Sequence, residues 1–391
     1  MDQPTDRTRW MQVIEEIGPG FAEGVEERDR DDTFIADHYT TFRDRGLLSA
    51  MIPESLGGGG ATHSTVAAAL RRLAWYDPSA ALALSMHQHL IAAQVFNHLQ
   101  GKPAPVLSRV ANDQVVLVST GARDWLDSNG EVRRVEGGYV VSARKAFASG
   151  SPAGDIAVTS APYLDSEVGW QVLHFAVPFA TAGVSLADDW YTHGMRATGS
   201  RTIVFDEVFV PEGAITLRRP SEEWGPWHVV LAVALPLIAG VYVGIAERAA
   251  EVARELCASR GRTSTTVQWS VGEMQSALVV ARACHDRMVA LTNDLDFTPS
   301  IDLSDEALVL KTQTVESARL VVERAVEAVG GVGFYRSAGL ERLLRDVRAG
   351  DYHPFPAKEQ RLLTGRRALG LPPIEPHVAA TPSEVLAPAP A

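Results

Sequence analysis

The hydrophobic periodicity of this chain changes twice along its length, and this restricts the folds open to it. Residues 1–110 place apolar side chains at helical spacing, as in "THSTVAAALRRLAWYD" and "PSAALALSMHQHLIAAQVFNHL". Between 113 and 217 the runs are short and rich in β-branched and aromatic residues, such as "WQVLHFAVP" and "RTIVFDEVFVP". From 226 the helical spacing returns. The pattern predicts helices, then an antiparallel sheet or barrel, then helices again.

These changes predict an α+β protein with three domains and a tail. We expect an N-terminal helical domain at 1–112, a middle antiparallel β domain at 113–220 and a C-terminal helical bundle at 221–375. The tail, 376–391, is rich in Pro and Ala, a composition typical of disorder. A chain of 391 residues is long enough to divide its core among such units.

The C-terminal region has the clearest helical pattern. Long helices are predicted at 226–259, 268–293 and 304–329, with Ser304 as the N-cap of the last one. Apolar residues three and four positions apart give this last helix one stripe that a bundle would bury: Val315, Ala318, Val322, Ala325 and Val329.

Residues 229–246, "VVLAVALPLIAGVYVGIA", form an apolar run of 18 residues without a charge. This length is at the lower edge of what a membrane span requires. The run contains Pro236 and continues at helical spacing into the charged "ERAAEVARE". We therefore expect a helix buried inside a bundle and no membrane association.

Composition excludes several classes of partner and compartment. The net charge of -12 and the absence of a basic stripe argue against nucleic acid as a partner. Cys257 and Cys284 form no CxxC motif and no disulfide framework, which indicates a reducing compartment. The first ten residues are polar and mixed in charge, so no signal peptide is expected. We predict a cytoplasmic protein.

Three segments resemble the acyl-CoA dehydrogenase superfamily. They are "LLSAMIPESLGGGG", "GMRATGSRTIVFDEVFVPEGAI" and "GGVGFYRSAGLERLLRD", in the order and at spacings similar to those of the family. The resemblance covers roughly residues 35–370. It implies an N-terminal helical bundle, a middle antiparallel β domain and a C-terminal helical bundle, with a flavin between them. It also implies a homo-oligomer, usually a tetramer, with a dimer as the alternative.

The resemblance also points to residues that would hold the flavin. The family's Lys-x-Trp-x-Thr strand corresponds here to "KAFASG", which puts Phe147 against the flavin ring and Ser149 at its N5 side. An alternative reading is that these two side chains only alternate across a strand. Ser119 or Thr120 would supply a hydroxyl from the second flavin strand, although "VSTGARDWLDSNG" departs from the family's pattern.

Further cofactor contacts are implied at the far end of the C-terminal helices. Arg260 matches an arginine that meets the FAD pyrophosphate of the neighbouring subunit, and Gly330 and Gly331 match the family's Gly-Gly loop. Glu327 stands where the family has a glutamine, and a carboxylate is an awkward neighbour for a phosphate. FAD is therefore the expected cofactor, with FMN as the alternative.

A dehydrogenase of this family needs a carboxylate base that removes the α-proton of a thioester. The two positions that supply it in the family correspond here to Pro354 and Ala234, neither of which can accept a proton. The nearest group able to do so is His353, in the turn "GDYHPFPAKEQ". Upstream, "SMHQHL" carries His87 and His89, which diverge on a helix, and we expect His87 to face the cavity.

Histidines at these places resemble the flavin monooxygenase branch of the superfamily, which includes dibenzothiophene monooxygenase. This branch uses O2 and reduced flavin supplied by a separate reductase, and a reductase partner is implied here. We predict a monooxygenase or hydroxylase acting on a small organic or natural-product substrate, with His353 and His87 as catalytic residues. An acyl-CoA or acyl-carrier dehydrogenase with an atypical base is the alternative, and a flavin-binding protein without activity is a third. No metal site is expected from the histidines, because no Cys or carboxylate accompanies them.

Overall fold

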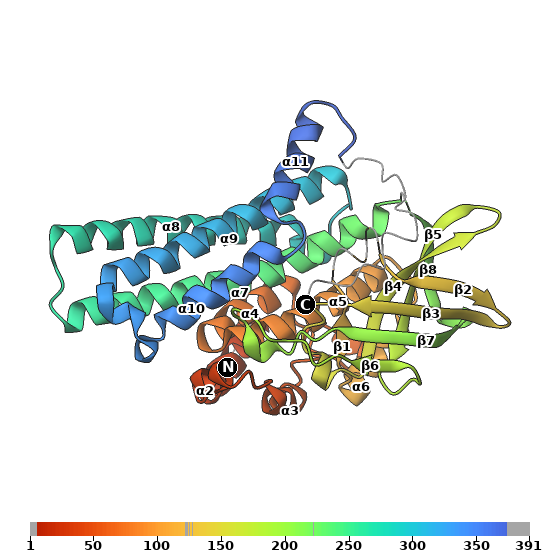
Figure 1. Ribbon diagram of the computed structural model, residues 1–391, viewed down its shortest axis with the longest axis horizontal. Helices are drawn as coiled ribbons and strands as arrows, with labels where there is room; N and C mark the ends of the chain where they lie inside the picture. Colours follow the sequence, from red (N-terminus) through yellow and green to blue (C-terminus); the bar gives the residue numbers. More distant parts are fainter. Residues whose placement is uncertain (1–5, 122–123, 125, 127, 222, 374–391) are drawn as a thin grey trace.

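The computed structural model describes residues 6–121, 124, 126, 128–221 and 223–373; the predicted tail at 376–391 lies outside the described residues. Two helical layers pack on each other, and two β-sheets lie at one end of the long helices (Figure 1). The N-terminal helices are α1 Asp6–Ala22, α2 Val25–Arg30, α3 Ala36–Asp44, α4 His63–Tyr76, α5 Pro78–Leu99 and α6 Pro105–Asp113.

Local sequence explains where the central N-terminal helices begin. Thr62 caps α4 by accepting a hydrogen bond from the N–H of Thr65 at 3.2 Å. Asp77 caps α5 in the same way, and Pro78 occupies the first helical position, where no N–H is needed.

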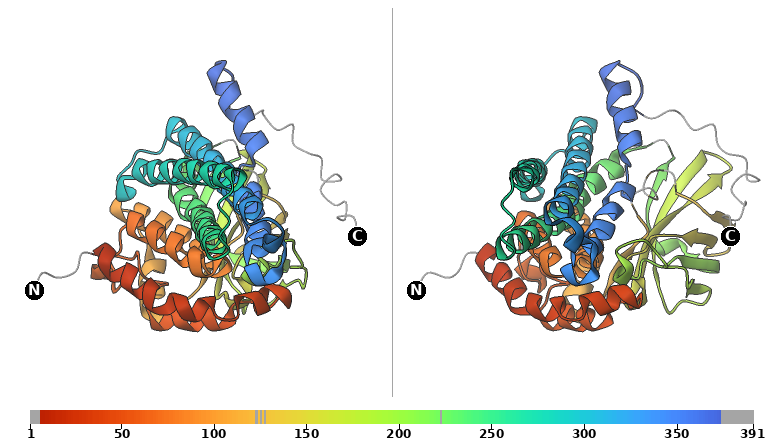
Figure 2. Two further views of the ribbon diagram at one scale, coloured as in Figure 1. Left: turned by 90° about the vertical axis from the view of Figure 1, so that its left-hand side faces the viewer. Right: turned by 60° about the vertical axis from the view of Figure 1, so that its left-hand side comes forward.

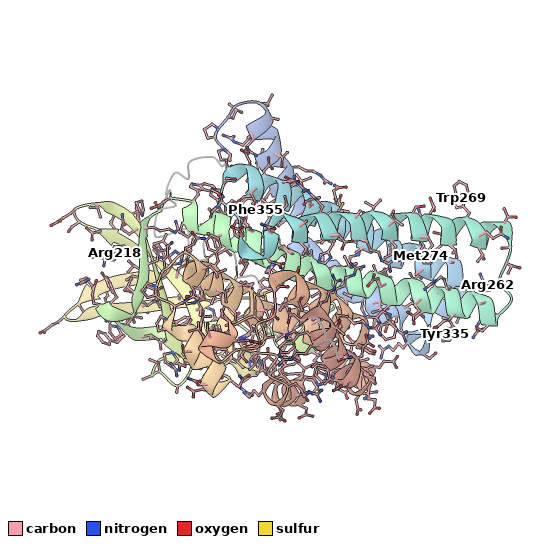
Figure 3. All side chains as sticks on the ribbon, turned by 180° about the vertical axis from the view of Figure 1, so that it is seen from behind. Arg218, Arg262, Trp269, Met274, Tyr335 and Phe355 are labelled. Carbon is pink, nitrogen blue, oxygen red and sulfur yellow. The ribbon has the colours of Figure 1, made fainter. Side chains whose placement is uncertain are left out.

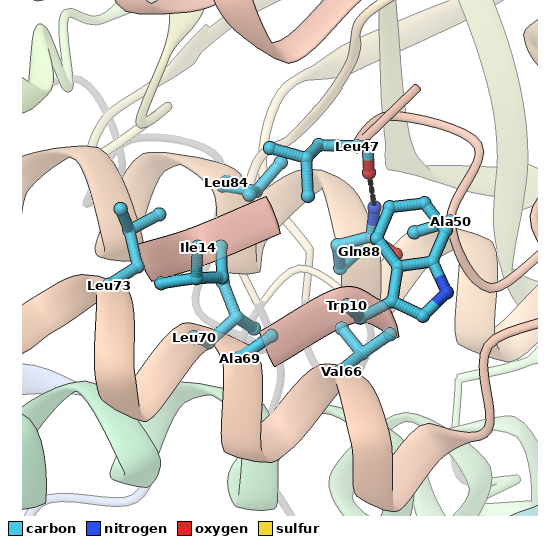
Figure 4. Close-up of a pocket in the computed structure, with 10 residues that line it drawn as sticks. All are labelled: Trp10, Ile14, Leu47, Ala50, Val66, Ala69, Leu70, Leu73, Leu84 and Gln88. Carbon is cyan, nitrogen blue, oxygen red and sulfur yellow. Dashed lines mark hydrogen bonds between the residues drawn. The ribbon is translucent and has the colours of Figure 1, made fainter. Parts of the chain in front are cut away.

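Apolar side chains of α1, α4 and α5 pack without room for a ligand. A void of only about 10 Å³ remains among them, close to the size of one water molecule, so this region is core (Figure 4). The residues around it are Trp10, Ile14, Leu47, Ala50, Val66, Ala69, Leu70, Leu73, Leu84 and Gln88.

The middle domain consists of two four-stranded sheets, with strand orders β1-β4-β5-β8 and β2-β3-β7-β6. The predicted antiparallel arrangement is confirmed for every described strand pair except β1 and β4, which run parallel. The strands are β1 Leu117–Ser119, β2 Glu131–Val135, β3 Gly138–Lys145, β4 Ile156–Asp165, β5 Gly169–Pro178, β6 Val184–Leu186, β7 Ile203–Pro211 and β8 Ile215–Pro220.

The C-terminal region is helical, as predicted, and lies on the N-terminal helices (Figure 2). The last of the three long helices begins at Ile301 and is capped by Ser300, whose hydroxyl accepts from the N–H of Leu303. The predicted cap, Ser304, is instead buried inside this helix, where its hydroxyl lies 2.7 Å from Nδ1 of His228. The helices are α7 Gly225–Ser259, α8 Thr265–Leu291, α9 Ile301–Val329, α10 Leu340–Asp346 and α11 Ala357–Ala368.

Short 3-10 helices connect the longer elements. Two of them, η3 and η8, border the candidate site described below. They are η1 Glu54–Leu56, η2 Ser151–Ala153, η3 Arg196–Thr198, η4 Glu212–Ala214, η5 Asn293–Leu295, η6 Gly330–Phe334, η7 Arg336–Ala338 and η8 Val347–Tyr352.

The apolar run 229–246 lies in α7, which crosses the centre of the molecule. Among the described residues this helix alone is long and apolar enough to span a membrane, but 94% of its most apolar window is buried inside the protein. Pro236 lacks an N–H and disturbs the preceding turn. Two buried histidines bond carbonyls beside it: Nε2 of His63 lies 2.9 Å from the Val233 oxygen, and Nε2 of His285 lies 3.0 Å from the Pro236 oxygen. The helix is therefore a core element with polar support from its neighbours.

Candidate active site

A cavity of about 930 Å³ lies where α5 and α7 meet the β domain and the turn after η8. Its polar side is formed by residues after β1 and β3, by the segment that leads into η3 and by the turn at 351–354. Its apolar wall comes from two helices: Leu82 and Met86 of α5, and Leu231, Ala234, Leu235 and Ile238 of α7. A volume of this size is typical of a site for a cofactor or small organic molecule.

Phe147 supplies a flat apolar surface to this cavity. Its side chain is 64% exposed, and the edge of Trp190 approaches its ring with centroids 5.9 Å apart and planes at 82°. The prediction of a strand at "KAFASG" is corrected, because β3 ends at Lys145 and Phe147 has φ +59°. Such a conformation is strained for a bulky residue and persists only where neighbours hold it, which is a common feature of binding sites.

Ser149 lines the cavity next to Phe147 and begins a row of buried hydroxyls. Its Oγ lies 2.7 Å from Oγ of Ser200, which in turn lies 2.7 Å from Oγ1 of Thr198. Thr198 donates to the carbonyl oxygen of Met195 at 2.8 Å. The row ends on the backbone carbonyl of Met195, the residue before η3.

The two candidate hydroxyls after β1 lie in different places. Thr120 lines the cavity and donates to Asp124, whereas Ser119 does not line it and accepts from the N–H of Gly121 at 3.2 Å. Asp124 also forms an ion pair with Lys145 at 3.2 Å. Burial raises the pKa of Asp124 and lowers the pKa of Lys145, while their contact opposes both shifts. Of the two predicted residues, only Thr120 reaches the cavity.

His353 is held at the cavity by two buried side chains. Nζ of Lys311 lies 2.8 Å from the His353 oxygen and 2.9 Å from the Phe355 oxygen, which fixes the turn. Oη of Tyr242 lies 2.5 Å from Nε2 of His353. Burial, then the Lys311 ammonium and His89, lower the pKa of His353 to about 3. Burial lowers the pKa of Lys311 to about 8.

The prediction that His87 faces the cavity is wrong. Its Nε2 lies 2.8 Å from the Leu48 oxygen, and its Nδ1 lies 3.0 Å from the N–H of Leu117, so both ring nitrogens bind backbone groups. His87 is thus a structural link between α5 and β1. His89, two residues along the helix, lines the cavity, and burial lowers its pKa to about 4.

Both positions at which the resembling dehydrogenases carry their base lie in the cavity wall. They are Ala234 and Pro354. The carboxylates among the described lining residues are Asp124 and Asp351, and Asp351 is paired with Arg319 at 3.1 Å. Each is thus ion-paired with a cation. In the described ranges no group of three or more His, Cys, Asp or Glu could hold a metal ion.

Three predicted cofactor residues lie away from this cavity. Arg260 ends α7 and is exposed, and Gly330, with φ +68°, stands next to Arg262 between α9 and η6. Gly331 follows it and is exposed. Figure 3 shows this end of the helices, with Arg262 and Tyr335, far from Phe355, which lies just after the turn at 351–354. Within one chain these residues and the cavity cannot contact the same small ligand.

Sequence reasoning missed the residues that support the site. Tyr242 lies within the apolar run, and Ser200 lies in the recognised "GMRATGS" segment, but neither was assigned a role. Lys311 carried a usable signal: a lone cation on the side of a helix that the bundle buries needs acceptors, and these are the carbonyls of His353 and Phe355.

Comparison with known proteins agrees with this geometry. The family description "Acyl-CoA dehydrogenase, N-terminal domain" matches residues 12–100, and "Acyl-CoA dehydrogenase, C-terminal domain" matches residues 236–357. An amino sugar nitrososynthase of Streptomyces rubradiris is 30% identical over 88% of this chain and 85% of its own length. Dibenzothiophene monooxygenase of Rhodococcus erythropolis is 27% identical over 84% of this chain and 85% of its own length.

A solved structure shows the same fold. The X-ray structure of KijD3 in complex with FMN and dTDP-3-amino-2,3,6-trideoxy-4-keto-3-methyl-D-glucose superposes with a TM-score of 0.86 at 26% identity, covering 95% of both chains. The resemblance seen in the sequence, including the monooxygenase branch, is thereby confirmed. The chain belongs to the acyl-CoA dehydrogenase family.

Proposed function

We propose that this protein is a flavin-dependent monooxygenase that oxygenates a small organic substrate with O2. The observation that carries the proposal is the composition of the cavity wall. Both places for a dehydrogenase base hold residues that cannot take a proton, and His353 and His89 line the same space. A neutral imidazole suits hydrogen bonding to oxygen species better than it suits removal of an α-proton.

The cavity has the donor set that a flavin needs. Phe147 offers an aromatic face, Ser149 and Thr120 offer hydroxyls, and the side chains of α5 and α7 offer an apolar wall for a flat ring. These residues would hold the isoalloxazine. When bound, reduced flavin supplies the two electrons with which one atom of O2 enters the substrate and the other leaves as water.

His353 can act as a hydrogen-bond donor toward the cavity. The buried hydroxyl of Tyr242 has no other hydrogen-bond partner in the described part of the chain, so its proton is satisfied when it donates to Nε2 of His353. Nδ1 then carries the imidazole proton, and no described protein group accepts it. The side chain therefore holds a proton at Nδ1 for an acceptor in the cavity, while the apolar wall excludes water.

The relatives indicate the kind of substrate. One is named an amino sugar nitrososynthase, another a dibenzothiophene monooxygenase, and KijD3 was solved with FMN and a dTDP-linked amino sugar. We infer a small organic substrate with an oxidisable nitrogen, sulfur or carbon. The flavin, as FMN or FAD, arrives reduced from a separate reductase in the cytoplasm, a compartment that suits the unpaired Cys257 and Cys284.

We further propose that the chain forms a homo-oligomer, a tetramer or a dimer, through the far end of its C-terminal helices. Trp269 of α8 is 69% exposed and Tyr335 is 68% exposed, and both lie at this end of the helices (Figure 3). Phe334, next to Tyr335 in the chain, is also exposed. Large apolar side chains gathered on a surface are typical of interfaces. A second copy would bring Arg260 and the Gly330 loop to the flavin of its neighbour.

The proposed function is tested with isotope and spectroscopy together. The protein is supplied with reduced FMN or FAD by a flavin reductase under ¹⁸O2, with a panel of amines, sulfur heterocycles and phenols. We expect one ¹⁸O atom in a product. In a second arm, oxidised flavin-protein is mixed with acyl-CoA thioesters without oxygen. Bleaching of the flavin there would establish a dehydrogenase, and neither result would indicate a flavin-binding protein without activity.

A further inference from the structure

The hydroxyl groups of Ser149, Ser200 and Thr198 form a continuous row that starts at the cavity, where Ser149 and Ser200 are both lining residues. All three side chains are buried, and the two O–O distances along the row are both 2.7 Å. The row ends at the carbonyl oxygen of Met195, 2.8 Å from Oγ1 of Thr198. In such a row each hydroxyl has one proton to give, so the direction of one hydrogen bond fixes the others.

The carbonyl end determines that direction. A carbonyl oxygen has no proton, so at 2.8 Å Thr198 must be the donor to Met195. With its proton used, Thr198 accepts from Ser200. Ser200 has then used its proton as well and accepts from Ser149. The proton of Ser149 therefore points into the row, and its oxygen offers only lone pairs to the cavity.

The end of the row is fixed by hydrogen bonds to both the N–H and the carbonyl of Met195, which belong to adjacent peptide groups. Its N–H donates to Oδ1 of Asp346 at 2.6 Å. Its carbonyl also accepts from Nε1 of Trp190 at 3.3 Å and from the N–H of Thr198 at 3.2 Å. The acceptor that orients the row therefore cannot easily turn away.

We propose that Thr198 and Ser200 are positioning residues that make Ser149 a hydrogen-bond acceptor and so bias the site toward reduced flavin. The proposal rests on the proposed function, because it takes flavin as the ligand of this cavity. The resemblance implies that flavin N5 would lie at Ser149. Reduced flavin carries a proton on N5 and would donate it to the Ser149 oxygen. Oxidised flavin has only a lone pair on N5, so the Ser149 hydroxyl would have to break its hydrogen bond to Ser200 in order to donate to N5.

The test compares the dissociation constants of oxidised and dithionite-reduced FMN under anaerobic conditions. In the parent protein we expect reduced FMN to bind about tenfold more tightly, the value of one exchanged hydrogen bond. Ser200→Ala frees the Ser149 proton, and Thr198→Val lets Ser200 turn its proton toward Ser149. Both variants should bring the ratio of the two constants close to one by strengthening the binding of oxidised FMN.

Two controls separate this effect from general damage. Ser151→Ala removes a neighbouring buried hydroxyl that donates to the Gly199 oxygen at 3.1 Å and lies outside the row, so it should keep the parent ratio. 5-Deaza-FMN has carbon at position 5 and therefore offers no N–H at that position in its reduced form. Its two redox states should therefore bind the parent protein equally well.

The outcomes distinguish this inference from the proposed function. If FMN binds and the ratio is the same in the parent, Ser200→Ala and Thr198→Val, the row does not set the preference and the inference fails alone. If neither form of FMN binds the parent protein in this cavity, the flavin itself is excluded and both proposals fall. Because either substitution breaks the row, one well-folded variant is sufficient for the decision.

Discussion

The two ring nitrogens of His353 have different surroundings, and this defines what the residue can do. Nε2 meets the hydroxyl of Tyr242, whose pKa is raised well above its usual value by burial and by nearby Asp346 and Asp351. Tyr242 therefore remains protonated and able to donate. Because the pKa of His353 is about 3, the ring is neutral above that pH and keeps its proton on Nδ1.

At the residue scale, we expect that a side-chain amide at position 353 can take over the hydrogen-bond donation of the His353 imidazole. His353→Gln retains an N–H and should keep oxygenation within about tenfold of the parent, whereas His353→Ala should lose about a hundredfold and release more H2O2 per reduced flavin. A pKa lowered from 6.5 to about 3 leaves the ring neutral between pH 5 and 8. The ratio of parent to His353→Gln rates should therefore be constant over that range. A break near pH 6.5 in this ratio would contradict the assignment.

The site residues that match family motifs could be predicted from the sequence. Residues whose role depends on the direction of a side chain could not. Phe147, Ser149 and His353 were placed by matching motifs, and all three line the cavity. His87 and His89 are two positions apart on one helix, so the sequence alone cannot say which one faces inward; contacts with Leu48 and Leu117 decide it. Hydroxyl direction at Ser149 depends on a partner about fifty residues away, which no local pattern reveals.

Among the elements, α7 is a buried apolar helix that contains a proline, so some of its buried carbonyls lack the usual partner within the helix. Its carbonyls near Pro236 are inside the protein and need partners that water cannot supply. His63 of α4 and His285 of α8, two helices that pack on α7, form hydrogen bonds with these carbonyls. Burial lowers the pKa of His63, which keeps it neutral and suited to this role. The bundle around α7 is therefore held by directional bonds as well as by apolar contacts.

We expect His63→Leu to lower the free energy of unfolding by about 1–3 kcal/mol, because the Val233 oxygen loses a buried donor. Urea unfolding at pH 7 measures the change. His98→Leu on α5 is the matched control, since the ring of His98 makes no hydrogen bond in the described ranges, and it should cost much less. Equal losses in the two variants would show that the bond to α7 contributes little.

Element boundaries and partners were predicted unevenly. The long helices follow from their apolar spacing, and their ends shift by a few residues where a nearby serine caps better, as Ser300 does in place of Ser304. The parallel pairing of β1 with β4 was not predicted, because β1 has only three residues and its partner lies far along the chain. Pairing direction depends on the path of the connection, and single-strand patterns do not contain it.

At the scale of the whole molecule, exposed aromatic residues lie both at the end of the long helices and in the β domain, and we propose an interface only for the helical end. Trp269, Arg262 and Tyr335 all lie at this end of the long helices, as do the predicted cofactor residues that do not line the 930 Å³ cavity (Figure 3). Trp170 of β5, 43% exposed, lies in the β domain instead. An interface at the helical end would explain why Arg260 stands so far from the 930 Å³ cavity of its own chain.

We expect Trp269→Glu to reduce the oligomer to smaller species, because it places a charge in the proposed interface. Sedimentation velocity over a range of concentrations measures the mass. Trp170→Glu is the matched control and should leave the mass of the parent unchanged. If both variants sediment like the parent, or if the parent is already a monomer, the helical end is not an interface between copies.

The hydrogen bonds of Lys311 to the turn that carries His353 are, among the described residues, those to the peptide carbonyls of His353 and Phe355. Every residue type carries such a carbonyl, so these two hydrogen bonds of Lys311 do not depend on which side chains stand at positions 353 and 355. We therefore expect that residue 353 can be replaced by other residue types while the backbone of the turn keeps its position at the cavity. For protein engineering, Lys311 is the residue to keep and His353 the residue to vary.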